Sequence, residues 1–381
     1  MDIDKLFEFE ECDNDGYILI AYRLANDPAV TDLDIPSVYK GKPVTSIENC
    51  AFFASEYLRR VKIPDGITTI CDMTFGNCDN LKTVILPSGL KKIGSQAFSI
   101  CEKLENITFP DGLEVIEDGA FSSCLSLKTV ILPDSVKEIG ESAFFRCTNL
   151  TSVVLPKNLT EISSDLFDYC ISLSHIELPD SIREIGDLAF DQCCLTSIKL
   201  PTRLEYIGES AFGGCDITSV TFPSTLKKIG REAFGYCIKL EKADFGDSTP
   251  LLEKGVFNFC ERLRAENFMQ GLAGSVDFTK PFQCQDPFPF DWDTALREDV
   301  FALAMKYNSF ALFDKKKVLA EITERGLVQF LPLAENARWD IADFMEEHFG
   351  EFFDISQKKG LTEITAWLLD YKNRKIGFGK V

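Results

Sequence analysis

The sequence has few of the residues and segments that most catalytic or membrane proteins need. Only two of its 381 residues are histidine, His175 and His348, and neither belongs to a recognisable catalytic motif. No run reaches the ~20 apolar residues of a membrane-spanning helix, so we expect no membrane insertion. The first residues, MDIDKLFEFE, lack the basic and apolar segments of a secretory signal, which favours a cytoplasmic location.

Short motifs that mark hydrolase, nucleotide or zinc sites are also missing. The sequence contains no GxSxG, GxxxxGK(S/T), GxGxxG or HExxH motif, and it has no CxxC pair. We therefore expect no catalytic residue, no metal site, no cofactor and no small-molecule substrate. An enzyme whose site lies in the C-terminal helical domain is kept as a third alternative.

Basic residues are the minority among the charged ones. Lys and Arg number 40 against 60 Asp and Glu, which gives a formal net charge of -20 and a pI of about 4.6. Such a surface repels the phosphates of nucleic acids and anionic membranes, so we expect no nucleic-acid partner. Hydrophobic residues make up 45% of the chain and charged residues 26%, which is a globular composition.

The dominant feature of the sequence is a repeat. The dipeptide Ala-Phe, or a close variant, recurs at intervals of 22 or 23 residues between Ala51 and Phe257. Cysteine stands four residues after the start of the dipeptide in nine of the ten units, and Ser55 takes that place in the first. The nine cysteines are Cys78, Cys101, Cys124, Cys147, Cys170, Cys193, Cys215, Cys237 and Cys260. A phase kept over so many units indicates a solenoid of stacked coils.

Each unit encodes a short strand, a stop and a turn. In residues 81–87 (LKTVILP) the alternation predicts a strand, and Pro87 ends it because proline cannot donate to a sheet. Recurrent glycines such as Gly94 and Gly140 are expected to give a positive φ where the chain bends. One coil buries too few apolar groups to fold alone, so stacked coils share a core. The Ala, Phe and Cys positions then form interior columns, with reduced thiols rather than disulfides or metal ligands.

The unit AFxxCxxLxxVxLPxxLxxIGxx resembles the BspA-like (treponemal-type) leucine-rich repeat, over about residues 33–264. The resemblance implies a right-handed solenoid of about ten 22–23-residue coils with parallel short strands. It also implies an adhesin-like relative that binds host or neighbouring-cell proteins, and hence a secreted or cell-surface location as the alternative to the cytoplasm.

The two ends of the chain depart from the repeat, so we predict an α+β repeat protein of four parts. Residues 1–32 contain two alternating segments around a turn and are predicted to form a hairpin cap on the solenoid, 33–264. Residues 265–292 are a Pro- and Phe-rich connector, and residues 293–381 show helical periodicity. The segment KKGLTEITAWLLDYKN within the last part is similar to the helical half of ankyrin repeats.

The outward positions of the predicted strands form the candidate partner-binding face. We expect a non-catalytic protein–protein interaction module, because solenoids bind partners on such faces and an apolar patch with a polar rim is typical of interfaces. Two alternatives stay open: an intracellular interaction scaffold, and an outward face that merely reflects the preference of strands for β-branched residues. The candidate residues are Thr83, Ile85, Asn106, Thr108, Thr129, Ile131, Ser152, Val154, His175, Glu177, Ser197 and Lys199.

Overall fold

The computed structural model describes residues 3–263, apart from 13–15, 26, 247, 249 and 254, and isolated residues between 350 and 369. The predicted connector, residues 265–292, lies outside the described residues. So does nearly all of the predicted helical domain, residues 293–381, including its ankyrin-like segment. Three residues of that segment, Lys358, Thr365 and Leu369, are described and have a helical backbone.

The N-terminal residues form the predicted hairpin. After the short helix α1 (Ile3–Leu6), strand β1 (Phe7–Cys12) pairs in antiparallel fashion with β2 (Gly16–Tyr22). Strand β2 also pairs with β5 (Lys42–Ile47), which pairs with β4 (Val38–Tyr39), and this completes a four-stranded sheet. The buried rings of Phe7 and Tyr22 contact the ring of Phe52, with centroids 6.3 and 5.3 Å away. The hairpin therefore covers the first phenylalanine of the repeat.

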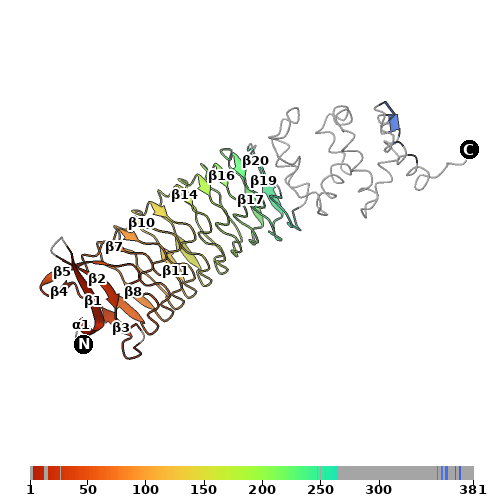
Figure 1. The fold of residues 1–381 in the computed structure, drawn as a ribbon. Coiled ribbons are helices and arrows are strands. Elements are labelled where there is room, and N and C mark those ends of the chain that lie inside the picture. The colour runs from red at the N-terminus through yellow and green to blue at the C-terminus, as the bar shows by residue number, and fades with distance from the viewer. Residues whose placement is uncertain are drawn as a thin grey trace, which may run out of the picture. The chain divides into compact units, whose positions relative to one another are not determined.

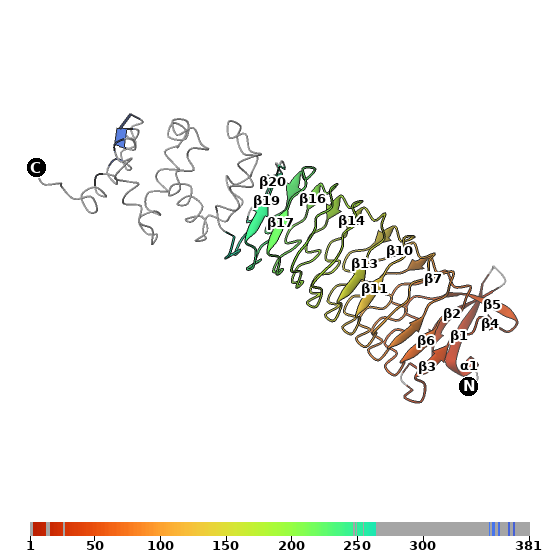
Figure 2. The ribbon, with the colours of Figure 1, turned by 180° about the vertical axis from the view of Figure 1, so that it is seen from behind.

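One row of parallel three-residue strands runs along the solenoid (Figures 1 and 2). Its strands are β3 (Asp32–Asp34), β6 (Arg60–Lys62), β8 (Thr83–Ile85), β11 (Thr129–Ile131), β13 (Ser152–Val154), β17 (Ser219–Thr221) and β19 (Lys242–Asp244). Between β8 and β11 only Asn106 pairs, with Thr83 on one side and Thr129 on the other. Residues 175–177 and 197–199, also predicted as strands, form none, so the row is interrupted between β13 and β17.

A second row of parallel strands, each two residues long, occupies another side of every coil. It forms two sheets. The first contains β7 (Thr69–Ile70), β9 (Lys92–Ile93), β10 (Val115–Ile116) and β12 (Glu138–Ile139). The second contains β14 (Glu161–Ile162), β15 (Glu184–Ile185), β16 (Tyr206–Ile207), β18 (Lys228–Ile229) and β20 (Leu251–Leu252). The two rows of strands therefore share one interior, although three coils contribute a strand only to the second row.

The recurrent glycine after the second row has a different role from the predicted one. Gly94 and Gly140 do not have a positive φ. They lie against the backbone of the preceding coil instead: a Cβ on Gly140 would come within 2.5 Å of the amide nitrogen of Asp118. Glycine is therefore needed here because two backbones approach too closely for any side chain.

Positive φ angles occur at two other positions of each coil, just before the Ala-Phe pair and three residues after its first member. In one coil these are Ser142 and Arg146, both with φ of 56°, and in the next Asp165 and Tyr169, at 55° and 57°. Non-glycine residues pay a conformational penalty of roughly 1–2 kcal/mol in this region. The stacking of neighbouring coils must therefore hold these turns in place.

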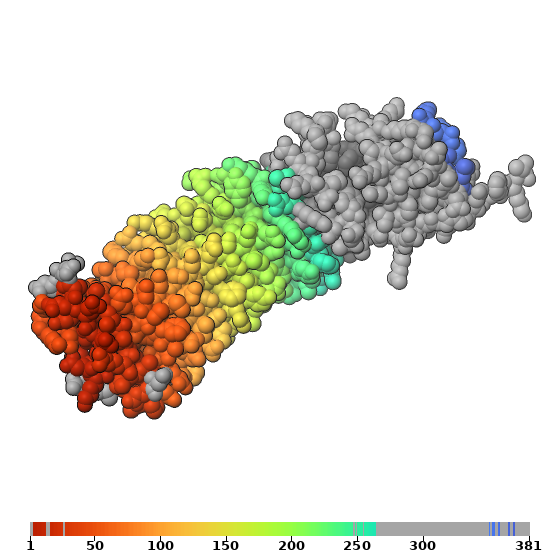
Figure 3. Space-filling model, in the orientation of Figure 1, coloured from red at the N-terminus to blue at the C-terminus, as the bar shows by residue number. Residues whose placement is uncertain are grey.

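The interior confirms the predicted columns. The phenylalanines are fully buried and stack coil upon coil, with ring centroids 4.9 to 5.8 Å apart between Phe52 and Phe257. The nine repeat cysteines are buried free thiols. Each donates a hydrogen bond from its Sγ to the carbonyl oxygen of the phenylalanine in the preceding coil, as in Cys147 to Phe121 at 3.3 Å. Ring stacking and these hydrogen bonds therefore join each coil to the next, and the coils form a continuous body in Figure 3.

Candidate partner-binding face

The outward positions of the first row are set by the alternation within each strand. In β8, β11 and β13 the middle residue, Val84, Val130 or Val153, points into the core and is buried. The residues on either side of it must then face solvent, because successive side chains of a strand alternate between its two faces. The predicted outward assignment is therefore correct in these three strands.

The structure brings eight of the twelve candidate residues together. Continuous pairing links Thr83 to Asn106, Asn106 to Thr129, and Thr129 to Ser152. We call the resulting surface the central face; all of its residues are exposed except the half-buried Thr129. Its members are Thr83, Ile85, Asn106, Thr108, Thr129, Ile131, Ser152 and Val154.

The other four candidate residues are exposed but do not join this sheet. His175, Glu177, Ser197 and Lys199 lie in the two coils where the first row is interrupted. His175 and Glu177 face each other, with Nε2 and Oε1 4.0 Å apart. The structure therefore gives a shorter continuous face than the sequence predicts.

One side of the central face is aliphatic. Ile85, Ile131 and Val154 are 39%, 60% and 50% exposed, and Ile131 and Val154 are paired in register on adjacent strands. Neighbouring strands lie about 4.8 Å apart, so the side chains of Ile131 and Val154 form a contiguous apolar surface. Thr108 occupies the coil between Ile131 and Ile85.

A hollow of about 630 Å³ opens beside these residues, on coils 83–86 and 105–110. Thr83 and Ile85 line one side of it, and Asn106 and Thr108 line the other. It lies where strand pairing is reduced to the single residue Asn106. The central face consequently combines a flat aliphatic part with a recess that has polar and apolar walls.

Charges adjoin the central face: Lys82 and Glu105 line the hollow, and Nζ of Lys128 lies 3.6 Å from Oε2 of Glu105. None of the eight residues of the central face is ionisable. Further ion pairs occur towards the two ends, between Arg60 and Asp34 at 2.7 Å and between Lys242 and Asp244 at 2.9 Å. The central face is therefore an uncharged segment in a chain of net charge -20.

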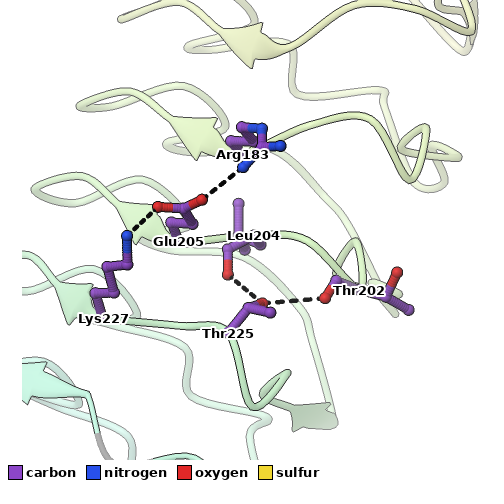
Figure 4. A network of polar contacts seen from close by, with 6 residues as sticks. All are labelled: Arg183, Thr202, Leu204, Glu205, Thr225 and Lys227. Carbon is purple, nitrogen blue, oxygen red and sulfur yellow. Dashed lines mark hydrogen bonds and ion pairs between the residues drawn. The ribbon is translucent and has the colours of Figure 1, made fainter.

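The second row presents another surface, and several charges beside its strands are paired; Glu161 and Glu184, in register within the row, have no ion pair among the described residues. Glu205 lies between two cations: its Oε1 accepts a bond from Nη1 of Arg183 at 2.7 Å, and its other oxygen contacts Nζ of Lys227 (Figure 4). Glu114 is flanked in the same way by Lys91 and Lys137, at 3.2 and 2.7 Å. The neighbouring cations hold the pKa of both glutamates below its ordinary value.

Neutral groups of the second row are also satisfied within it. In Figure 4, the hydroxyl of Thr225 donates towards the carbonyl oxygens of Thr202 and Leu204, at 3.0 and 2.7 Å. The ion pairs beside the second row were not predicted from the sequence. The available signal was the recurrence of opposite charges at one repeat period, at 183, 205 and 227.

The part of the chain that the structure describes contains no group of three or more His, Cys, Asp or Glu side chains that could hold a metal ion. Burial raises the pKa of the Cys147 thiol to about 12, so this interior thiol is not ionised at neutral pH. Among the same residues, no helix is long and apolar enough to cross a membrane.

Known proteins share this architecture. A family model described as a BspA type leucine rich repeat region matches residues 22–150, 68–195 and 183–276. A leucine-rich repeat protein from Bacteroides ovatus is 28% identical, over 69% of this chain and 74% of its own, with a TM-score of 0.56. The leucine-rich repeat protein of T. pallidum is 30% identical, over 62% and 88%, with a TM-score of 0.44.

A leucine-rich cell surface protein of Faecalibacterium prausnitzii is 24% identical, over 68% of this chain and 92% of its own, with a TM-score of 0.41. Among curated proteins, none resembles the chain. The family matches together extend from residue 22 to residue 276, well over half of the sequence, and their extent agrees with the coils seen in the structure. The chain therefore belongs to the BspA-type leucine-rich repeat family.

Proposed function

We propose that the chain is a non-catalytic protein-binding module and that the central face is its contact surface. One observation carries this proposal: four consecutive coils present eight outward residues without an ionisable group, in a chain of which 26% is charged. Three of the eight are aliphatic and well exposed. Apolar surface with a polar rim is the usual composition of the core of a protein interface.

The exposed aliphatic side chains of the central face would contribute to the free energy of binding. Burying the exposed parts of Ile85, Ile131 and Val154 would contribute roughly 1 kcal/mol each, from the area of such side chains. The hydroxyl and amide groups of Thr83, Asn106 and Ser152 would supply directional hydrogen bonds at the rim. A partner with a matching apolar surface and a side chain that enters the recess would satisfy both parts.

Two settings are compatible with this role. Membership of the BspA-type family supports an adhesin-like protein that binds host or neighbouring-cell proteins. The free thiols of the repeat support an intracellular interaction scaffold as the second candidate, because reducing compartments maintain cysteine in this form. The third alternative is an enzyme with a site in the C-terminal helical domain, and that site would lie outside the described residues.

The test is to recover partners with the full chain and with two isoleucine-to-glutamate variants. Ile131→Glu places a charge on the central face, and Ile238→Glu makes the same change at a side chain of 48% exposure elsewhere on the solenoid. We expect recovery of the partner to fall at least ~10-fold for Ile131→Glu, since an unpaired interfacial charge costs several kcal/mol. Ile238→Glu should bind like the original chain.

Equal recovery with both variants would remove the central face as the contact surface. Urea unfolding of both variants must be measured alongside. A normal unfolding midpoint for Ile131→Glu shows that lost binding reflects a lost contact and not a lost fold.

A further inference from the structure

One carboxylate in the middle of the solenoid is buried without compensation. Asp168 follows Phe167 in its coil and is only 5% exposed. Its Oδ1 has no hydrogen-bond partner among the described residues. Five other coils have a small residue at the equivalent position: Gly76, Ser99, Ser122, Gly213 and Gly235. Burial of a carboxylate here is thus a specific feature of this coil and not a requirement of the repeat.

The next coil places a second carboxylate at the same position. Asp191 is held beside Asp168 by two backbone hydrogen bonds between the coils, from Phe167 to Ala189 and from Tyr169 to Asp191, both at 2.9 Å. On its other side Asp191 lies over Gly213, whose Cβ, if present, would be 2.2 Å from its Oδ1. The side chain of Asp191 therefore occupies the space that a side chain at position 213 would need. Asp168 lies in the preceding coil and Gly213 in the following one.

The groups around this pair are acidic or neutral. Asp165 in the same coil faces Asp168, and Glu141 and Asp187 in the adjacent coils face Asp165. The nearby thiols of Cys170 and Cys193 are buried and uncharged. Arg146 in the preceding coil donates its backbone N–H to the carbonyl of Asp168, at 2.8 Å. In the described part of the solenoid, no ion pair involves Asp165, Asp168 or Asp191.

This environment favours the protonated form of the pair. Burial, followed by the charges of Asp191 and Asp165, raises the pKa of Asp168 to about 7, and only the backbone N–H of Tyr169 opposes the shift. Burial also raises the pKa of Asp191. Successive coils lie about 5 Å apart, and like charges at neighbouring positions of a desolvated site repel each other.

We propose that Asp168 and Asp191 form a pH-sensitive latch between two coils of the solenoid. When Asp168 carries a proton, the pair bears a single negative charge and the two loops stay packed. When that proton passes to water, two adjacent carboxylates remain in the loops, and the coils separate locally at this point. In the described part of the solenoid no other carboxylate is buried, so the other coils are not expected to respond in this way.

The linkage between proton binding and folding determines whether the contact between the two coils becomes weaker or stronger as the pH rises. The ordinary pKa of Asp168 is 3.8 and its value in the fold is about 7, so between these values the folded state binds more protons than the unfolded state. The stabilisation is complete below pH 3.8 and is lost as the pH rises through about 7. Local opening of the latch is therefore expected to increase from mildly acidic to mildly alkaline pH.

Amide hydrogen exchange of the full chain tests the proposal, because the amides of Phe167 and Tyr169 report the contact between the two coils. We compare the original chain with Asp168→Asn at pH 5 and at pH 8; comparison at one pH cancels the intrinsic dependence of exchange on pH. At pH 8 exchange of these amides should be at least ~10-fold slower in Asp168→Asn, and at pH 5 the two proteins should agree within about threefold. Asp79→Asn, the same change at an exposed residue, serves as the control.

A ratio of the two exchange rates that is the same at pH 5 and pH 8 would overturn the proposal, as would an equal response in Asp79→Asn. If Asp168→Asn loosens the coil at both pH values, Asp191→Asn decides the matter, since it removes the repelling neighbour and leaves Asp168 in place. Faster or unchanged exchange in both variants at pH 8 would show that the pair is not a latch.

Discussion

The two rows of strands share one interior, but the surfaces that they present to solvent differ in chemistry. Beside the second row, charges alternate between some coils, as in Arg183, Glu205 and Lys227, and these groups neutralise one another. The central face of the first row has no charge to neutralise and exposes Ile131 and Val154 instead. Ion pairs beside the second row link neighbouring coils, whereas the central face exposes aliphatic side chains to solvent. This difference separates the stabilising surface from the surface available to a partner.

The largest expected effect concerns the interior that both rows share. Phe144→Ala removes a fully buried ring between Phe121 and Phe167 and should lower the free energy of unfolding by about 3–5 kcal/mol. Phe145→Ala, one residue later and half-buried, should have a much smaller effect. Urea unfolding followed by circular dichroism measures both. Similar losses in the two variants would show that the phenylalanine column does not dominate stability.

The next largest loss of stability is expected at the glycines that follow the second-row strands, where neighbouring coils approach closely. In Gly186→Ala the new Cβ would lie 2.6 Å from the amide nitrogen of Ser164, so the backbones must separate, and we expect a loss of about 1–3 kcal/mol. Gly89→Ala is the matched control, because nothing lies within 4 Å of its Cβ. The two midpoints of urea unfolding should differ clearly, and coincident midpoints would contradict the close-approach role.

A smaller effect should appear when the charge pairing of the second row is broken. Glu205→Gln leaves Arg183 and Lys227 without their shared anion, so the midpoint of urea unfolding should fall slightly at neutral pH and low salt. Since the pKa of Glu205 lies below the ordinary 4.5, its contribution is present above that pH and lost as the pH falls below it. The difference from the original chain should also vanish in 1 M NaCl.

The control for this test is Glu102→Gln, at an exposed position for which the described residues show no ion pair. Its midpoint should not change with salt or with acidification relative to the original chain. A loss in Glu205→Gln that persists at high salt would show that the side chain acts through packing and not through charge.

The smallest change in stability is expected for a substitution on the central face. Ile131→Thr keeps a β-branched side chain at a position that is 60% exposed, so the free energy of unfolding should change by less than about 0.5 kcal/mol. Differential scanning calorimetry provides the measurement. A loss well above this value would mean that the face stabilises the solenoid, and the contrast between the two rows would fail.

The sequence predicts the coils and their interior because those positions repeat with the same chemistry. It does not predict the second row, since two-residue strands such as Glu161–Ile162 are too short to show alternation. The role of Gly140 was predicted wrongly, because a positive φ and a close backbone approach both demand glycine. The turns at Ser142 and Arg146 were missed because non-glycine residues occupy them.

The outward strand positions in β8, β11 and β13 were predicted correctly, but the continuous strand surface is shorter than the sequence predicts. Alternation continues through His175 and Glu177, but pairing does not. The interruption begins in a full-length coil, at 175–177, and continues in the first shortened coil, at 197–199, whereas the second shortened coil carries β17. Strand pairing depends on the register between neighbouring coils, which a pattern within one coil does not contain. The burial of Asp168 was likewise invisible, because it depends on the loop of the next coil.

The constant shape of the turns has an evolutionary consequence. Gly119 and Ser142, one coil apart, have the same left-handed backbone, with φ of 61° and 56°. Deleting residues 120–142 would join Gly119 to Ala143 with an unchanged conformation at the junction and every interior column still in phase. Unequal recombination can therefore lengthen or shorten such a gene by whole coils, and a lineage can vary the reach of the protein without inventing a new fold.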